Sequence, residues 1–110
     1  MPKVYITNRG CHDFSGATQF GDLIDLTVGK YNLLSLGRMH REMEPLLRES
    51  TPEDYILVCG PTVMNMVVAA IMSELHSRLN LLIYVVGRDG VGRYKRRNLI
   101  LIQEGVTPNE

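Results

Sequence analysis

One short segment gathers most of the side chains in this chain that could do chemistry. Residues 8–20 carry amide, guanidinium, imidazole, carboxylate and hydroxyl groups: Asn8, Arg9, His12, Asp13, Ser15, Thr18 and Gln19. An adjacent histidine and aspartate could supply a general base and the acid that orients it, yet such a pair in a loop more often forms a turn capped by the aspartate. We therefore expect hydrogen bonds and charge from this segment, with catalysis by His12 as the alternative.

The turn at residues 60–65 is the second candidate. Gly60-Pro61 leads directly into Thr62 and Val63, whose N–H groups would be unpaired at a helix N-terminus and would favour an anion. An ordinary turn between a strand and a helix is an equally good interpretation. The turn has neither the GxGxxG nor the Walker pattern, so conventional dinucleotide or ATP binding is not expected. Asn65, on an otherwise apolar stretch, either bonds nearby backbone or contacts a ligand.

Cysteines and histidines offer little further chemistry. Cys11 and Cys59 form no CxxC motif, which fits a reduced compartment, and we expect an ordinary thiol at Cys11 and a core residue at Cys59. The three histidines lie far apart in the sequence, so no metal site is expected. No cofactor is implied either.

The elements that must position these residues follow from hydrophobic patterning. Apolar and β-branched runs predict strands at 3–7, 21–27, 55–59, 81–86 and about 94–102. Helical spacing predicts one helix that begins near Asn32 and is kinked or broken at Pro45, and a second over 62–79. A short helical turn within 11–20 would let the first two strands pair in parallel. The 110-residue, 45% hydrophobic chain is predicted to form a single domain over 1–104 with a flexible tail at 105–110.

This element order predicts an α/β, Rossmann-like three-layer sandwich. Its mostly parallel sheet would have strand order 2-1-3-4-5, with an antiparallel strand at the C-terminal edge. In such sheets ligands bind at the carboxyl ends of the strands where the order reverses, here between the first and third strands. We therefore expect a nucleotide or other anionic small molecule between the two loops described above, bound by Asn8, His12, Asp13, Ser15, Phe20, Gly60, Thr62 and Asn65.

Charge is balanced in total but segregated along the chain. Twelve acidic residues match twelve basic ones, yet residues 78–97 are strongly basic and residues 42–54 strongly acidic. The sequence pI of about 6.8 argues against a dedicated nucleic-acid binder, and basic side chains also protect an edge strand from aggregation. The basic hairpin could instead bind another protein. Alternatively, the two segments could meet across a homodimer, with apolar surface from Met39, Met43, Met64 or Met66.

No membrane or export signal is expected. The chain has no apolar stretch of membrane-spanning length, and a strand-like run begins at Lys3. We expect a cytoplasmic protein.

The chain also resembles a group of small phage-encoded proteins of unknown function, up to about Val86. The matching residues are Val4-Tyr5-Ile6-Thr7-Asn8, His12-Asp13-Phe14-Ser15, Ala17, Phe20-Gly21, Asp54-Tyr55-Ile56-Leu57-Val58, Gly60, Asn65 and Leu81-Leu82. The resemblance implies a viral origin and a location in the host cytoplasm, and assigns no activity. Phage genomes encode small domains that bind or degrade host signalling nucleotides, and this analogy supports the nucleotide ligand expected above. The partner of the basic hairpin would then be a host protein. A nucleotide phosphodiesterase that uses His12 is a further alternative.

Overall fold

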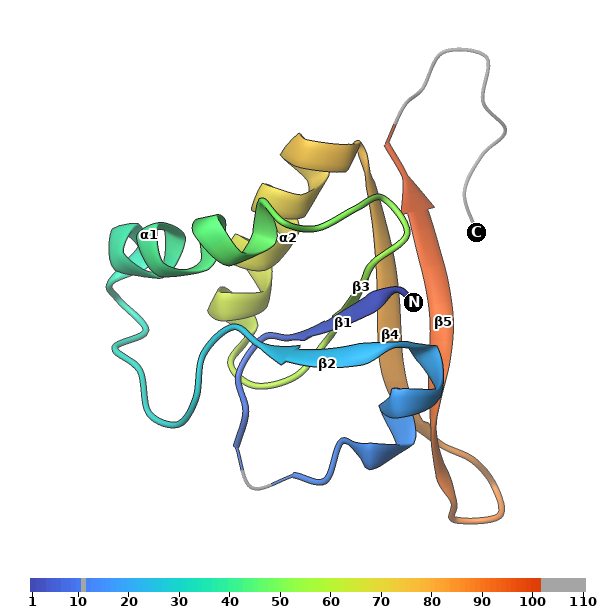
Figure 1. Ribbon diagram of the computed structural model, residues 1–110. Coiled ribbons are helices and arrows are strands. Elements are labelled where there is room, and N and C mark those ends of the chain that lie inside the picture. The colour runs from blue at the N-terminus through green and yellow to red at the C-terminus, as the bar shows by residue number, and fades with distance from the viewer. Residues whose placement is uncertain (11, 102–110) are drawn as a thin grey trace.

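A single sheet organises the protein, as a computed structural model that describes residues 1–10 and 12–101 shows (Figure 1). Its strands are β1 (Lys3–Ile6), β2 (Asp22–Asp25), β3 (Tyr55–Leu57), β4 (Arg78–Val86) and β5 (Gly92–Ile100), in the order β2-β1-β3-β4-β5. All neighbouring pairs are parallel except β4 and β5, which are antiparallel. The predicted α/β class, strand order and antiparallel edge are confirmed. The predicted tail at 105–110, Ile102 and Cys11 lie outside the described residues.

Helices cover the two faces of this sheet unequally. The helices α1 (Leu36–Leu47) and α2 (Thr62–His76) lie together on one face, and the short 3-10 helix η1 (Ser15–Phe20) lies on the other (Figure 1). Right-handed crossovers explain this arrangement, because the chain moves one way across the sheet through α1 and α2 and the opposite way through η1. The third layer is therefore a single short 3-10 helix with its flanking loop.

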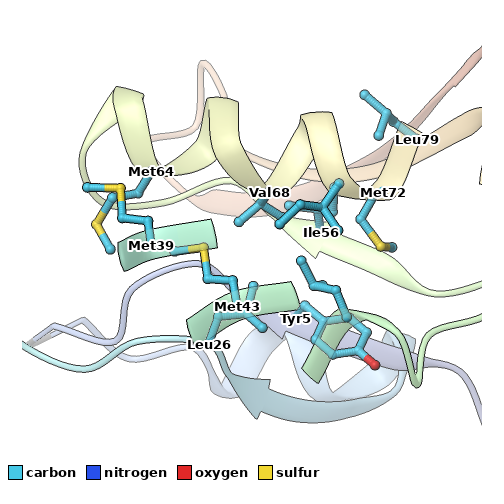
Figure 2. Packing of buried hydrophobic residues seen from close by; sticks show 11 residues of the cluster. Tyr5, Leu26, Met39, Met43, Ile56, Met64, Val68, Met72 and Leu79 are labelled. Carbon is cyan, nitrogen blue, oxygen red and sulfur yellow. The ribbon is translucent and has the colours of Figure 1, made fainter. Parts of the chain in front are cut away.

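The core under α1 and α2 is rich in methionine (Figure 2). Met39, Met43 and Met64 are completely buried there, against sheet residues such as Tyr5 and Ile56. These three of the four methionines considered for a contact surface therefore cannot contribute to it, because both helices turn them towards the sheet. Among the four methionines proposed for a contact surface, only Met66 is exposed, at 65%.

The first α-helix differs from its prediction at both ends. Asn32 accepts a bond from the Leu34 amide in a turn, and α1 begins four residues later at Leu36. The helix also continues through Pro45 and ends at Leu47, so no break occurs at the proline. Pro45 lies in the last turn, where it removes one backbone hydrogen bond, and the burial of Leu47 holds that turn on the core.

The second helix ends three residues earlier than predicted. Ser77 adopts a left-handed conformation, with φ of 54°, and its amide bonds the Ser73 carbonyl at 2.8 Å. Arg78 and Leu79 then pair with the end of β5, which lengthens β4 at its start. These two residues are therefore in a strand because they pair with distant residues, and the local hydrophobic pattern does not reveal this pairing.

The opposite core is smaller and leaves part of the hairpin uncovered. It consists of Val4, Ile6, Phe14, Ala17, Leu57 and Leu82. Beyond Leu82, residues 83–86 of β4 are all exposed. The β4–β5 hairpin forms a long ribbon at one side of the molecule (Figure 1). None of the helices in the described residues is long and apolar enough to cross a membrane.

Candidate functional site

Backbone bonding continues beyond β1 and β2 and ties together the loops that follow them. The Arg9 amide donates to the Thr27 carbonyl at 2.8 Å, and the Gly29 amide donates back to the Arg9 carbonyl at 3.0 Å. The Asn8 side-chain Nδ2, which is almost buried, donates to the Gly29 carbonyl at 2.9 Å. These loops are thus held in one fixed arrangement at the carboxyl ends of the strands.

The turn between β3 and α2 closes against the same loops. Gly60 has φ of +74°, and a Cβ at this position would lie 3.0 Å from the Cβ of Asn8. The Asn65 Nδ2 donates to the carbonyls of Cys59 at 2.8 Å and Pro61 at 3.1 Å. Of the two roles considered for Asn65, these bonds favour support of the turn over contact with a ligand.

A cleft of ≈ 580 Å³ lies where these segments meet. It is lined by Asn8, Gly10, His12, Gly29, Lys30, Tyr31, Leu33, Gly60 and Pro61. A second hollow of ≈ 430 Å³ shares His12 and Gly60 and continues past Asp13 and Phe14 to Tyr84 and Tyr94. Both lie at the carboxyl ends of β1 and β3, where the strand order reverses. Four of the predicted residues therefore come together here: Asn8, His12, Asp13 and Gly60.

Two other predicted residues lie elsewhere. Phe20 meets the ring of Tyr55 edge-on, with centroids 5.9 Å apart, and Tyr55 is the first residue of β3. It thus lies near the amino ends of the strands, because η1 carries the chain from the end of β1 back to the start of β2. Phe20 therefore does not line the cleft, although it was expected among the ligand-binding residues. Ser15, at the start of η1, lines a separate hollow against the hairpin.

Thr62 lies beside the cleft without lining it. It is the exposed first residue of α2 and follows Pro61, which does line the cleft. The Pro61 carbonyl accepts bonds from the amides of Met64 and Asn65, as expected for the first turn of a helix.

His12 and Asp13 do not form a catalytic pair. The Asp13 carboxylate accepts the Ser15 amide at 2.8 Å, and this bond lowers the pKa of Asp13. The His12 ring instead lies near Phe14, with centroids 6.2 Å apart. Among the described residues, no acid or base bonds the His12 imidazole, which leaves it as a hydrogen-bonding or charged group.

The nearby cation and thiol are also engaged. Arg9 forms an ion pair with Asp25 at 2.6 Å, and its guanidinium lies 5.2 Å from the centre of the Phe14 ring. Burial raises the pKa of the Cys59 thiol, which lies 3.6 Å from the Asn8 carbonyl oxygen. Cys59 is therefore a partly buried neutral thiol, in agreement with its prediction as a core residue. Across the described part of the chain, no three His, Cys, Asp or Glu residues cluster as a metal site would require.

The loop after β2 contributes residues that the sequence analysis missed. Lys30 and Tyr31 line the cleft, and Lys30 has no ion pair within the described residues. The Tyr31 hydroxyl bonds Glu42, and Arg38 lies over the Tyr31 ring at 4.7 Å, so helix α1 fixes this aromatic side chain. The predicted parallel pairing of the first two strands already placed this loop at the same edge of the sheet. That pairing could have identified Lys30 and Tyr31 as residues near the cleft.

Comparison with known proteins gives one family. The family described as Phage Pam3 gp32-like protein matches residues 2–95, which include β1 to β4 and the first residues of β5. No curated protein and no solved structure matches the chain.

Proposed function

The chain belongs to the Phage Pam3 gp32-like protein family, and we propose that this phage protein binds a nucleotide or a similar anionic small molecule in the cleft beside Asn8 and Gly60. The expected place of action is the host cytoplasm. The observation that carries this proposal is the combination of a free cation, Lys30, and an aromatic ring, Tyr31, in a cleft at the reversal of strand order.

The lining of the cleft suits the two parts of a nucleotide. Lys30 supplies a positive charge for phosphate, and Tyr31 an aromatic wall for a base. Gly10, Gly29 and Gly60 allow close approach of a ligand to the backbone. The volume of ≈ 580 Å³ falls within the usual range for small-molecule sites, about 300–1,000 Å³.

Binding is favoured over hydrolysis. A phosphodiesterase that used His12 would need a second group to orient the imidazole or to stabilise the developing charge. Asp13 is bonded to the Ser15 amide and Arg9 to Asp25. The site therefore offers recognition groups without an assembled catalytic set.

The proposal is tested by calorimetric titration of the full chain with AMP, cyclic AMP and cyclic dinucleotides. We expect saturable binding of at least one of them, weakened about fivefold or more in Lys30→Gln, the loss of roughly 1 kcal/mol of charge-assisted bonding. Arg88→Gln removes the same charge from an exposed position in the hairpin turn and should leave the affinity unchanged. The absence of binding by every nucleotide would overturn the proposal.

The hairpin supports a second candidate, protein interaction. Ile83, Val85 and Val86 are 37%, 42% and 61% exposed, and β5 is an open edge strand with basic side chains. Either a host protein or a second copy of this chain could cover this surface. Light scattering at two salt concentrations tests the second copy: a mass near 12.4 kDa at both, even at high protein concentration, would contradict a homodimer.

A further inference from the structure

A separate group of arginines lies at the opposite edge of the sheet. A hollow of ≈ 500 Å³ opens there beside the first residues of β3 and β4. The hollow is lined by aromatic, amide and basic residues, Tyr55, Arg78, Asn80, Arg96, Arg97 and Asn98, and by the acidic residue Glu53. Because the strands β1 and β3 run away from this edge, the hollow is distinct from the cleft at their carboxyl ends.

Arg78 is held in place by a chain of hydrogen bonds, most of them partly buried. Its Nη2 donates to Asn80 Oδ1 at 2.9 Å, and the Asn80 Nδ2 donates to the carbonyls of Pro52 at 2.7 Å and Asp54 at 3.2 Å. The Asp54 side chain is buried in turn, and accepts the backbone amides of Lys3 and Thr51. The guanidinium of Arg78 is therefore positioned before any ligand arrives.

One nitrogen of this guanidinium has no partner. The Nε atom of Arg78 is buried and forms no hydrogen bond with any described residue. An unpaired buried donor on a charged group is costly to the folded state. An anion in the hollow would offset part of this cost through its charge, without having to reach the buried Nε atom.

Two further arginines reach the hollow from β5. The Arg96 guanidinium lies 5.9 Å from the centre of the Phe20 ring, and Arg97 Nη1 donates to the Arg96 carbonyl at 2.6 Å. None of Arg78, Arg96 and Arg97 forms an ion pair within the described residues. Three arginines and one acidic residue, Glu53, thus line a single hollow.

We propose that Arg78, Arg96 and Arg97 form a binding site for a small molecule that carries phosphate groups. Guanidinium groups suit this ligand class because their planar N–H pairs match phosphate oxygens in two-point contacts. Asn98 adds an amide, and Tyr55 adds an aromatic wall. The hollow is compact, and Glu53 at its margin would repel a long polyanion, which favours a small molecule over a nucleic-acid strand.

Inorganic tripolyphosphate is the probe, titrated into the full chain while the backbone and arginine Nε–H signals are followed by NMR. We expect saturable binding that moves the Arg78 Nε–H signal, and affinity about tenfold lower in both Arg78→Gln and Arg96→Gln. Arg96 is exposed, so Arg96→Gln tests the site even if Arg78→Gln disturbs folding. The Arg93→Gln control removes an arginine from the same strand, where Arg93 pairs with Asp89 at 2.7 Å, and should change the affinity less than twofold, about 0.4 kcal/mol.

Three results would overturn the proposal. The first is tripolyphosphate binding that does not saturate. The second is an Arg93→Gln variant that weakens binding as much as Arg96→Gln, which would indicate diffuse attraction by the basic strand. The third is a single-stranded oligonucleotide that binds while tripolyphosphate neither binds nor competes. The Lys30→Gln variant separates this site from the nucleotide cleft, since it should leave tripolyphosphate binding at the arginine hollow intact.

Discussion

The two faces of the sheet are built to different depths. On one face, α1 and α2 enclose a core that contains Met39, Met43, Met64, Met72 and seven other buried residues. On the other face, η1 and its flanking loop complete a core of only six buried residues, and the outer half of β4 extends beyond it. Figure 1 shows the contrast between the helical layer and the short 3-10 helix, and Figure 2 shows the core under the helical layer.

This difference follows from the direction in which the chain crosses the sheet. Both long crossovers move from β2 towards β4 and place their helices on the same face, while the connection from β1 to β2 moves the other way. That connection contains only a six-residue helix. The lesson is that strand order decides which face receives each helix, and the length of each connection decides how thick the cover becomes.

The largest expected effect comes from emptying the core on each face with the same substitution. Ile56 and Ile6 are both buried to within 1%, and they belong to the helical core and the 3-10 core respectively. Isoleucine-to-alanine changes in cores cost about 2–5 kcal/mol. We expect Ile56→Ala near the upper end, because two packed helices cannot close the cavity, and Ile6→Ala near the lower end, because η1 can settle towards the sheet.

Urea denaturation of both variants measures the difference. Equal free energies of unfolding, or a larger loss in Ile6→Ala, would show that the 3-10 layer is as rigid as the helical layer.

The next effect concerns the turn that joins β3 to the helical layer. Gly60→Ala combines a positive φ with a Cβ 3.0 Å from that of Asn8, and should cost about 2–3 kcal/mol. Gly90 is a matched control, because it has φ of +77° with nothing within 4 Å of the added Cβ. Gly90→Ala should therefore cost only about 1 kcal/mol, the strain of the backbone. Thermal unfolding of both variants compares them, and equal losses would mean that Asn8 yields to the added methyl group.

Alkaline pH tests the helical core through Tyr5. Burial, assisted by the charges of Asp54 and Glu49, raises the pKa of Tyr5 from 10.0 to about 12. Between these values the unfolded chain loses the proton while the folded chain keeps it, so stability is full below pH 10 and falls as pH rises towards 12. The slope contributed by one such group is at most about 1.4 kcal/mol per pH unit.

Tyr5→Phe should remove this pH-dependent contribution to stability. It should also preserve stability at pH 7, because the Tyr5 hydroxyl has no hydrogen-bond partner among the described residues. The free energies of unfolding of both proteins are compared between pH 9 and about 11.5, a range chosen to include the pH at which this tyrosine titrates in the unfolded chain. Parallel curves for the two proteins would mean that Tyr5 titrates like an exposed tyrosine.

The smallest change in stability is expected in the outer part of the β4–β5 hairpin, which neither helical layer covers. Val86 is 61% exposed in the outer hairpin, so Val86→Thr should change the free energy of unfolding by less than about 0.5 kcal/mol. The measurement is made at two protein concentrations tenfold apart. A larger loss that depends on concentration would reveal that this surface is covered by a second copy of the chain.

Much of the architecture could be predicted from the residues alone. The apolar runs at Lys3–Ile6 and Tyr55–Leu57 are strands because they are β-branched, aromatic or aliphatic segments between turns. Crossover handedness then favours the observed order, and that order locates the edge at which the cleft lies. These features depend on local patterning and on general chirality, both of which are present in the sequence.

The composition of the cleft and the ends of the helices were decided by the tertiary structure. Phe20 lies at the far edge because η1 spans the sheet, and Lys30 joins the cleft because the bridge between Arg9 and Val28 holds its loop beside β1. Helix α2 stops at His76 because Arg78 and Leu79 find partners at the end of β5, about twenty residues later in the chain. Each of these outcomes depends on contacts between distant segments, and a local pattern does not contain the free energy of such contacts.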